Sequence, residues 1–126
     1  MIKFTLANIE EVNEINRISE NMYPLTSVYV VGKDDGKLVS YCVIVIKEGY
    51  SDFIDAYTLD EKDDYLKLVT TKAAFNLVDL SGIHKVYYKE ENENLHKLIN
   101  DLGFEKVKDN QYFLDLTDYF KPCNCK

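Results

Sequence analysis

The sequence lacks the features of membrane-spanning and secreted chains. Its longest unbroken apolar run, residues 41–46, is far shorter than the roughly 18 residues that cross a bilayer. Three cysteines are too few and too unevenly placed for the disulfide framework of a small secreted domain. The first four residues lack a basic segment followed by an apolar one. We therefore expect a soluble, cytoplasmic protein with reduced thiols and no membrane partner.

The chain also lacks an excess of basic residues. It carries 15 lysines and arginines against 22 aspartates and glutamates, which gives a formal net charge of -7. Affinity for nucleic acid depends on basic side chains that neutralise phosphates, and no basic cluster is present in the sequence. We therefore expect no nucleic-acid partner.

No fixed-period repeat, Ser/Pro-rich linker or low-complexity segment divides the chain. A length of 126 residues suits one domain, and 46% hydrophobic residues are enough for a packed core. We predict a single domain over residues 1–120, followed by a short tail at residues 121–126.

The spacing of apolar residues predicts six or seven strands and three helices. Alternation with a period of two indicates strands, and spacings of three and four indicate helices. The predicted strands are residues 2–6, 28–31, 38–46, 53–59, 85–88, 105–107 and 112–114. The helices are expected to begin at Asn8, near Asp63 and at Asn92, where polar residues can cap them. In the second helix, the predicted inward stripe is Leu66, Val69, Ala73, Leu77 and Leu80.

The third predicted helix ends in Gly103-Phe104 and lies between a strand and a final hairpin. This order resembles the GNAT superfamily of acyl-CoA-dependent N-acyltransferases, whose helix here reads N-x-x-A-x-x-x-Y-x-x-x-G-F. Asn92, Gly103 and Phe104 match that pattern in register, with Leu95 at the small apolar position. The resemblance covers essentially the full chain. It implies an α/β fold (an α+β mixed sheet) of mostly antiparallel strands, with one splayed parallel pair and three flanking helices.

The loop that binds the diphosphate of CoA in that family reads R/Q-x-x-G-x-G/A. In this chain its place is taken by residues 60–65, which contain four acids and no glycine. A carboxylate about 5 Å from a phosphate charge costs about 3 kcal/mol at an effective dielectric constant of about 20. Solvent screening reduces the cost to about 1 kcal/mol for each acid. We interpret these acids as residues that cap and charge the start of a helix.

Two further family features are replaced. The tyrosine that protonates the leaving thiolate in many family members corresponds to Ile99, which can transfer no proton. Tyr87 or Tyr88 could substitute for it, although both are also ordinary sheet residues. The two helices that usually shape the acceptor cleft are represented only by residues 21–26. The acceptor wall is therefore shortened or supplied by a partner chain.

The resemblance implies candidate site residues along the splayed strands. Asp55 shares a predicted strand face with Phe53 and Tyr57, where it could act as a general base or simply accept hydrogen bonds. Glu90, beside Glu91, would lie at the cleft mouth or in a solvated loop. In an active member, acetyl-CoA or another acyl-CoA would lie between residues 53–59 and 85–88. The implied cofactor contacts are Ala56, Tyr57, Thr58, Leu59 and Asn92.

The remaining reactive side chains form no complete metal site in the sequence. His84 and His96 lack the i,i+4 spacing that places two imidazoles on one metal. Cys42 is expected in the core as a small apolar residue. Cys123 and Cys125 in the tail are either incidental or take part in thiol chemistry or metal capture between two copies.

The sequence thus supports two main hypotheses. The first is acyl-CoA-dependent N-acyltransfer to an amine acceptor, which could be a small molecule or a protein. The alternative is a non-catalytic GNAT-fold module that binds a protein or a small ligand and needs no cofactor. A third hypothesis, a thiol adaptor, depends on the tail alone. The ten tyrosines would also suit the surface of a homodimer.

Overall fold

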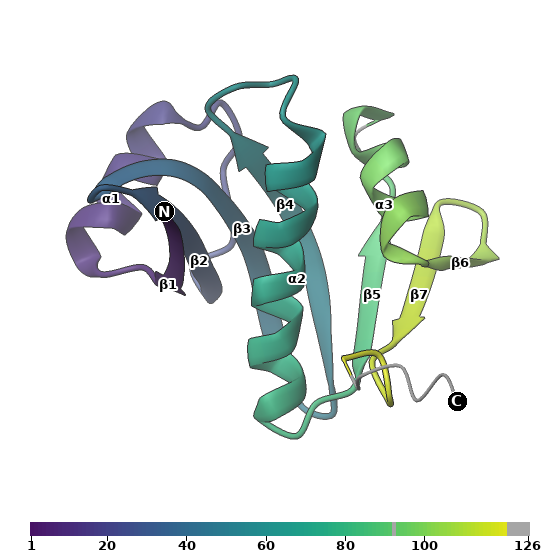
Figure 1. The fold of residues 1–126 in the computed structure, drawn as a ribbon. Coiled ribbons are helices and arrows are strands. Elements are labelled where there is room, and N and C mark those ends of the chain that lie inside the picture. The colour runs from purple at the N-terminus through teal and green to yellow at the C-terminus, as the bar shows by residue number, and fades with distance from the viewer. Residues whose placement is uncertain (92, 121–126) are drawn as a thin grey trace, which may run out of the picture.

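Seven strands form one mixed sheet in the computed structural model, which describes residues 1–91 and 93–120 (Figure 1). The strand order is β1-β2-β3-β4-β5-β7-β6. Only β4 and β5 are parallel, and the other neighbouring strands are antiparallel. The fold class predicted from the sequence is confirmed. The strands are β1 (Ile2–Leu6), β2 (Ser27–Asp34), β3 (Lys37–Lys47), β4 (Tyr50–Thr58), β5 (Lys85–Lys89), β6 (Glu105–Lys108) and β7 (Gln111–Asp115).

Helices cover both faces of the sheet (Figure 1). One face carries α1 (Ile9–Ile18), and the other carries α2 (Asp64–Leu80) and α3 (His96–Leu102), which follows a short 3₁₀ turn, η1 (Glu93–Leu95). As predicted, α1 begins after Asn8: Asn8 Oδ1 accepts from the Glu11 N–H at 2.8 Å, and Glu11 Oε1 accepts from the Asn8 N–H at 2.9 Å. This reciprocal cap satisfies two amides that a helix start leaves unpaired.

Two apolar clusters lie on opposite faces of the sheet. The smaller one, beneath α1, contains Ile15, Tyr29, Val31, Tyr41 and Val43. The larger one lies beneath α2 and α3, and it includes Cys42, which is fully buried as predicted. Both faces of β3 are therefore covered, so β3 is a central strand.

The buried stripe of α2 differs from the stripe predicted by apolar spacing. The buried residues are Leu66, Thr70, Thr71, Ala74, Phe75 and Val78, whereas Leu80 is 77% exposed. Two threonines can face the core because Thr70 Oγ1 donates to the Leu66 carbonyl at 2.6 Å and Thr71 Oγ1 to the Lys67 carbonyl at 2.8 Å. Hydroxyls satisfied within the helix remove most of the cost of burial.

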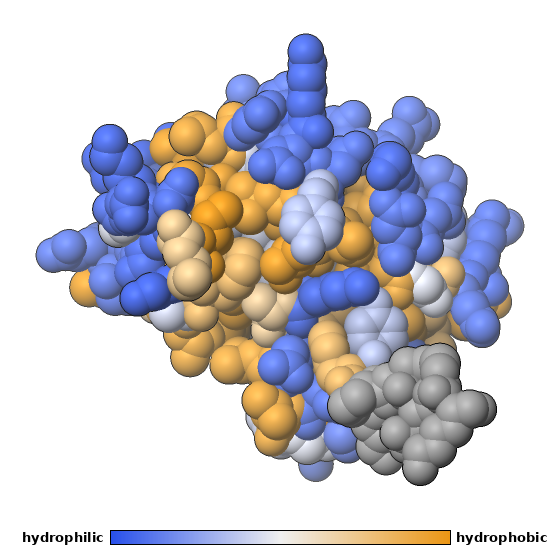
Figure 2. All heavy atoms as spheres, viewed as in Figure 1, coloured by the Kyte–Doolittle hydropathy of each residue, from blue (hydrophilic) through white to orange (hydrophobic). Residues whose placement is uncertain are grey.

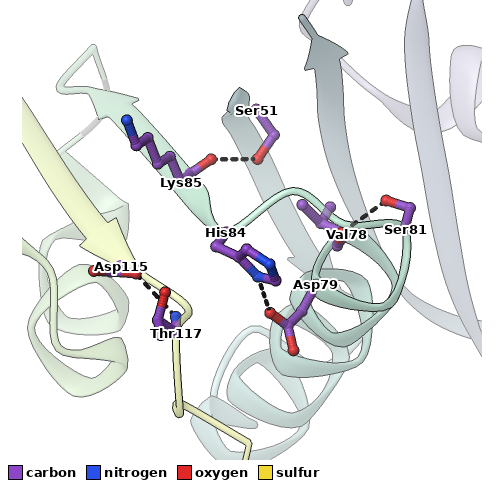
Figure 3. A network of polar contacts seen from close by, with 8 residues as sticks. All are labelled: Ser51, Val78, Asp79, Ser81, His84, Lys85, Asp115 and Thr117. Carbon is purple, nitrogen blue, oxygen red and sulfur yellow. Dashed lines mark hydrogen bonds and ion pairs between the residues drawn. The ribbon is translucent and has the colours of Figure 1, made fainter. Parts of the chain in front are cut away.

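The parallel strands β4 and β5 pair at one end only. Their register runs from Ser51–Val86 to Phe53–Tyr88, and β4 then continues to Thr58 without β5 beside it. At the closed end, Ser51 Oγ donates to the Lys85 carbonyl at 3.2 Å, and His84 Nδ1 lies 2.6 Å from Asp79 Oδ1 (Figure 3). These contacts anchor the start of β5 to β4 and to the end of α2. Toward their carboxyl ends the two strands diverge (Figure 1).

Candidate functional site

A β-bulge in β4 decides where Asp55 points. The β3–β4 register pairs Ile44 with Phe53 and Val43 with Asp55, so Ile54 is the extra residue. Phe53 therefore packs beneath α2, with its ring centroid 5.7 Å from that of Phe75, while Asp55 faces the α1 side. The predicted shared face of Asp55 and Phe53 is wrong, because simple alternation does not include the extra residue.

Asp55 accepts hydrogen bonds from neutral donors. Tyr23 Oη lies 2.5 Å from Asp55 Oδ2, and Tyr41 Oη lies 3.0 Å from Tyr23 Oη. Because the single hydroxyl proton of Tyr23 goes to Asp55, Tyr41 donates to Tyr23. Asn21 Nδ2 is 3.5 Å from Asp55 Oδ2, and the Ala56 N–H donates to Asp55 Oδ1 at 2.9 Å. We call Asp55, Tyr23, Tyr41 and Asn21 the Asp55 network.

The electrostatics keep the network's tyrosines protonated. Burial, followed by the hydrogen bond to Asp55, raises the pKa of Tyr23, and burial also raises the pKa of Tyr41. Among the residues that the structure describes, Asp55 forms no ion pair. Its hydrogen-bond donors are neutral groups: a hydroxyl, an amide side chain and a backbone N–H.

A cavity of about 570 Å³, the Asp55 cavity, runs from this network to the starts of α2 and α3. This volume is typical of small-ligand sites. Hydrophilic side chains gather over the upper edge of the molecule, near the loop that leads into α2 (Figure 2). The lining residues are Ile18, Ser19, Glu20, Asn21, Tyr23, Tyr41, Asp55, Ala56, Tyr57, Thr58, Glu61, Asp64, Lys67, Asn94, Leu95 and Lys97.

The predicted cofactor contacts are only partly brought together. Ala56, Tyr57 and Thr58 line the Asp55 cavity. Leu59 is 66% exposed, and its N–H donates to the Val39 carbonyl at 2.9 Å. Asn92 lies outside the described residues, as do Cys123 and Cys125 of the predicted tail.

Glu90 does not join Asp55 in the Asp55 cavity. Its carboxylate oxygens lie 3.4 Å from Tyr112 Oη and 3.5 Å from His96 Nδ1. A second cleft of about 530 Å³ opens nearby, and its lining includes Glu91, Tyr87 and the turn between β6 and β7. The two carboxylates predicted from the resemblance therefore belong to different surroundings.

Acidic side chains accept hydrogen bonds from two amides near the start of α2, that of Leu66 in its first turn and that of Lys62 in the turn before it. Asp63 Oδ1 accepts from the Leu66 N–H at 3.0 Å, and Asp60 Oδ1 accepts from the Lys62 N–H at 3.0 Å. A helix start binds an anion through such amides when they are free. The residues therefore do not fit the diphosphate of CoA, since the two amides are already paired with carboxylates of this chain.

The predicted substitutes for the general acid lie away from the Asp55 cavity. Ile99, at the position of the family tyrosine, is 1% exposed in the core. Tyr88 is buried against Phe53 and Phe104, and Tyr87 lines the second cleft. The Asp55 cavity thus holds Asp55 without either proposed acid beside it.

Sequence reasoning missed Tyr23 and Tyr41. Tyr23 lies in the short segment between α1 and β2, and Tyr41 lies in a strand that appears simply apolar. The register of the antiparallel strands β3 and β4 could have placed Tyr41 near Asp55, because Tyr41 pairs with Tyr57 and Val43 pairs with Asp55. The described residues contain no group of three or more histidines, cysteines or acids able to hold a metal.

Within the described ranges, no helix is long and apolar enough to span a membrane.

No family model matches the sequence, and a search of curated proteins found no match. Solved structures do match, and several of them are N-acetyltransferases. The chain has the fold of the GNAT superfamily.

Three similar structures illustrate this likeness. The first is the ribosomal-protein-S18-alanine N-acetyltransferase from Escherichia coli (TM-score 0.72, 10% identity, covering 92% of this chain and 94% of that one). The second is the spermidine/spermine N-acetyltransferase SpeG from Vibrio cholerae (TM-score 0.72, 11% identity, covering 94% of this chain and 97% of that one). The third is an N-acetyltransferase from Staphylococcus aureus (TM-score 0.69, 13% identity, covering 92% of this chain and 99% of that one). At these identities the likeness establishes the fold alone.

Proposed function

We propose that the protein is a small-ligand-binding module built on the GNAT fold, which binds its ligand in the Asp55 cavity and does not hold acyl-CoA by the diphosphate. The observation that carries this proposal is the pairing of the Lys62 and Leu66 amides with Asp60 and Asp63. A diphosphate would have to displace two carboxylates of the chain before reaching these donors.

The charges around the start of α2 support the same proposal. Glu61 and Asp64 also line the Asp55 cavity. Lys97 lies 3.0 Å from Asp101 and 3.6 Å from Asp64, so its charge is already shared between two acids. Even after solvent screening, each acid near a phosphate costs about 1 kcal/mol. A bound diphosphate would therefore meet repulsion where GNAT enzymes offer donors.

A second candidate function is acyl-CoA-dependent N-acyltransfer. The diverging strands β4 and β5 favour it, as does Asp55, a carboxylate in a cavity where an amine could lose a proton. The similar structures are acetyltransferases, which makes acetyl-CoA the donor to test.

Calorimetry and a turnover assay separate the two candidates. We expect no heat of binding for acetyl-CoA at millimolar concentration, and no release of the CoA thiol in the presence of a panel of amines. The paired variant Asp60→Gly/Asp63→Gly frees the Lys62 and Leu66 amides and is expected to gain weak CoA binding. Glu61→Gln removes one acid without freeing an amide and serves as its control. Micromolar binding or turnover by the wild-type protein would favour the acyltransferase.

A further inference from the structure

We propose that two copies of this chain associate through an apolar face formed by β1, β2 and one flank of α2, with α2 of each copy packed on β1 and β2 of the other. We call this surface the β1–α2 face. The inference is independent of the ligand of the Asp55 cavity. The side chains that carry it are Phe4, Leu6, Val28, Val69, Ala73 and Leu80.

The sheet part of the face lies beside α2. Phe4 and Val28 pack at the margin of the larger apolar cluster, on the α2 side of the sheet. Leu6 points to the same side as Phe4, because alternate residues of a strand share a face. However, β1 is an edge strand and α2 packs mainly on β2, β3 and β4. The β1 side chains are therefore left without a helix over them, and Leu6 is 54% exposed.

A close approach at Gly32 joins this part of the sheet to α2. A Cβ atom at Gly32 would overlap Ser40 Oγ and would lie 3.0 Å from the ring of Phe4. Glycine thus leaves room for both neighbours. Ser40 Oγ in turn lies 2.8 Å from Thr70 Oγ1 of α2. Phe4 therefore lies close to the foot of the helix, and the apolar surface continues from β1 to α2.

The helix part of the face is the flank of α2 that points toward β1. The opposite flank faces β5, because Asp79 Oδ1 lies 2.6 Å from His84 Nδ1 (Figure 3). At 3.6 residues per turn, Val69, Ala73 and Leu80 lie on the other side of the helix from Asp79. All three belong to the apolar stripe predicted from the sequence. That stripe therefore continues out of the core onto an uncovered flank, where Leu80 is 77% exposed.

The charge distribution favours a second copy at this face. The whole chain carries a net charge of -7, yet none of the six side chains of the face is charged. Two copies of an acidic chain repel one another wherever their acids meet, so an uncharged face is where they can approach. Hydrophobic side chains gather on the side of the molecule that carries α2 (Figure 2). Their burial between two copies would drive association.

The shape of the face suits a two-fold dimer. In Figure 1, α2 stands in front of the sheet, and β1 and β2 lie lower beside it. A two-fold rotation places α2 of the partner over β1 and β2, with the two α2 flanks in contact. The face contains fewer side chains than the roughly 20–30 per partner of a standard interface. We therefore expect a weak dimer, with a dissociation constant of about 100 µM. At the low micromolar concentrations of optical unfolding experiments, the protein is then monomeric.

Sedimentation equilibrium of the full-length protein with a reducing agent tests the proposal. We expect the mass to rise from monomer toward dimer between about 10 µM and about 1 mM. Leu6→Glu and Leu80→Glu should each weaken the dimer about tenfold or more, because they bury a charge in an apolar interface. Val107→Glu is the matched control: it adds the same charge on β6, the opposite edge strand, where Val107 is 51% exposed. It should change the dissociation constant by no more than about twofold.

A dilution series of the wild-type protein followed by two-dimensional NMR needs no variant. The amide signals of residues 4–6 and 73–80 should move with concentration, and those of residues 105–108 should stay. A monomeric mass at about 1 mM would overturn the proposal. Equal weakening by all three glutamate variants would also overturn it, since general repulsion would then explain the losses. A dimer found only without the reducing agent would come from Cys123 or Cys125 and would contradict the β1–α2 face.

Discussion

The placement of Asp55 depends on a single extra residue. Period-two alternation predicts the strand and identifies the carboxylate, but it places Asp55 beside Phe53. The bulge at Ile54 moves the two side chains to opposite faces, one into the core and the other into the cavity. A bulge depends on how two strands pair, so the sequence of one strand does not reveal it.

The position of Phe53 in the core can be tested by removing its side chain. The side chain is 2% exposed and contacts the rings of Phe75, Tyr88 and Phe104. We expect Phe53→Ala to lower the free energy of unfolding by about 3–5 kcal/mol, because it leaves a cavity in the main core. Urea denaturation followed by circular dichroism measures the change.

Leu80 provides the control for Phe53. It belongs to the stripe predicted from apolar spacing, yet it is 77% exposed. Leu80→Ala should change the free energy of unfolding by no more than about 0.5 kcal/mol. A loss comparable to that of Phe53→Ala would show that the predicted stripe, rather than the observed one, faces the core.

Among the helices, α1 combines a cap with an ion pair. Glu11 accepts from the Asn8 N–H and pairs with Lys33 of β2 at 3.0 Å. Burial alone would raise the pKa of Glu11, but the Asn8 hydrogen bond and Lys33 outweigh it, and the pKa lies below 4.5. A carboxyl with a lowered pKa in the folded state stabilises the protein above its unfolded pKa and loses that effect as the pH falls.

Glu11→Gln should therefore destabilise the protein in a pH-dependent way. The variant retains an oxygen for the Asn8 N–H but loses the ion pair with Lys33. We expect a loss of about 0.5–1 kcal/mol at pH 7 that shrinks as the pH falls through the lowered pKa of Glu11. Urea titrations at several pH values measure it. A difference that grows toward acid pH would contradict the pKa direction.

The start of α2 is a second element whose cap can be tested. Asp63 is the N-cap, and its carboxylate accepts from the Leu66 N–H. Asp63→Ala should lower the free energy of unfolding by about 1 kcal/mol, because the amide loses its partner. Asp63→Ser retains a capping oxygen and should stay close to wild type. Thermal denaturation of both variants measures the two stabilities. If Asp63→Ser lost as much stability as Asp63→Ala, the carboxylate would contribute more than a capping hydrogen bond.

The sequence predicted most of the elements but not all of their inward faces. Asn8 correctly predicted the start of α1, and Gly103 correctly predicted the end of α3, where its φ is 93°. Both signals are local, because a cap depends on the residue at the helix end itself. Thr70 and Thr71 could not be predicted as core residues from polarity. Their hydroxyls become compatible with burial through the carbonyls of the preceding turn and, for Thr70, through Ser40 Oγ at 2.8 Å.

For the whole molecule, the sequence predicted the architecture but only part of the candidate site. Element order and the Gly103-Phe104 ending carried the resemblance to the GNAT superfamily, and that resemblance implied the splayed sheet. Asp55 was recognised, but its partners were not, because Tyr23 and Tyr41 come from different elements and meet only across the folded sheet. The acidic loop at residues 60–65 was read as a helix cap, and Asp63 has that role in the structure.

We propose that the start of α2 does not hold the diphosphate of CoA. The most direct measurement is a titration of the wild-type protein with CoA, following the amide signals of Lys62 and Leu66 by two-dimensional NMR. Because these amides donate to Asp60 and Asp63, we predict that their signals do not move at millimolar CoA. A saturable shift of both signals at micromolar CoA would contradict the account.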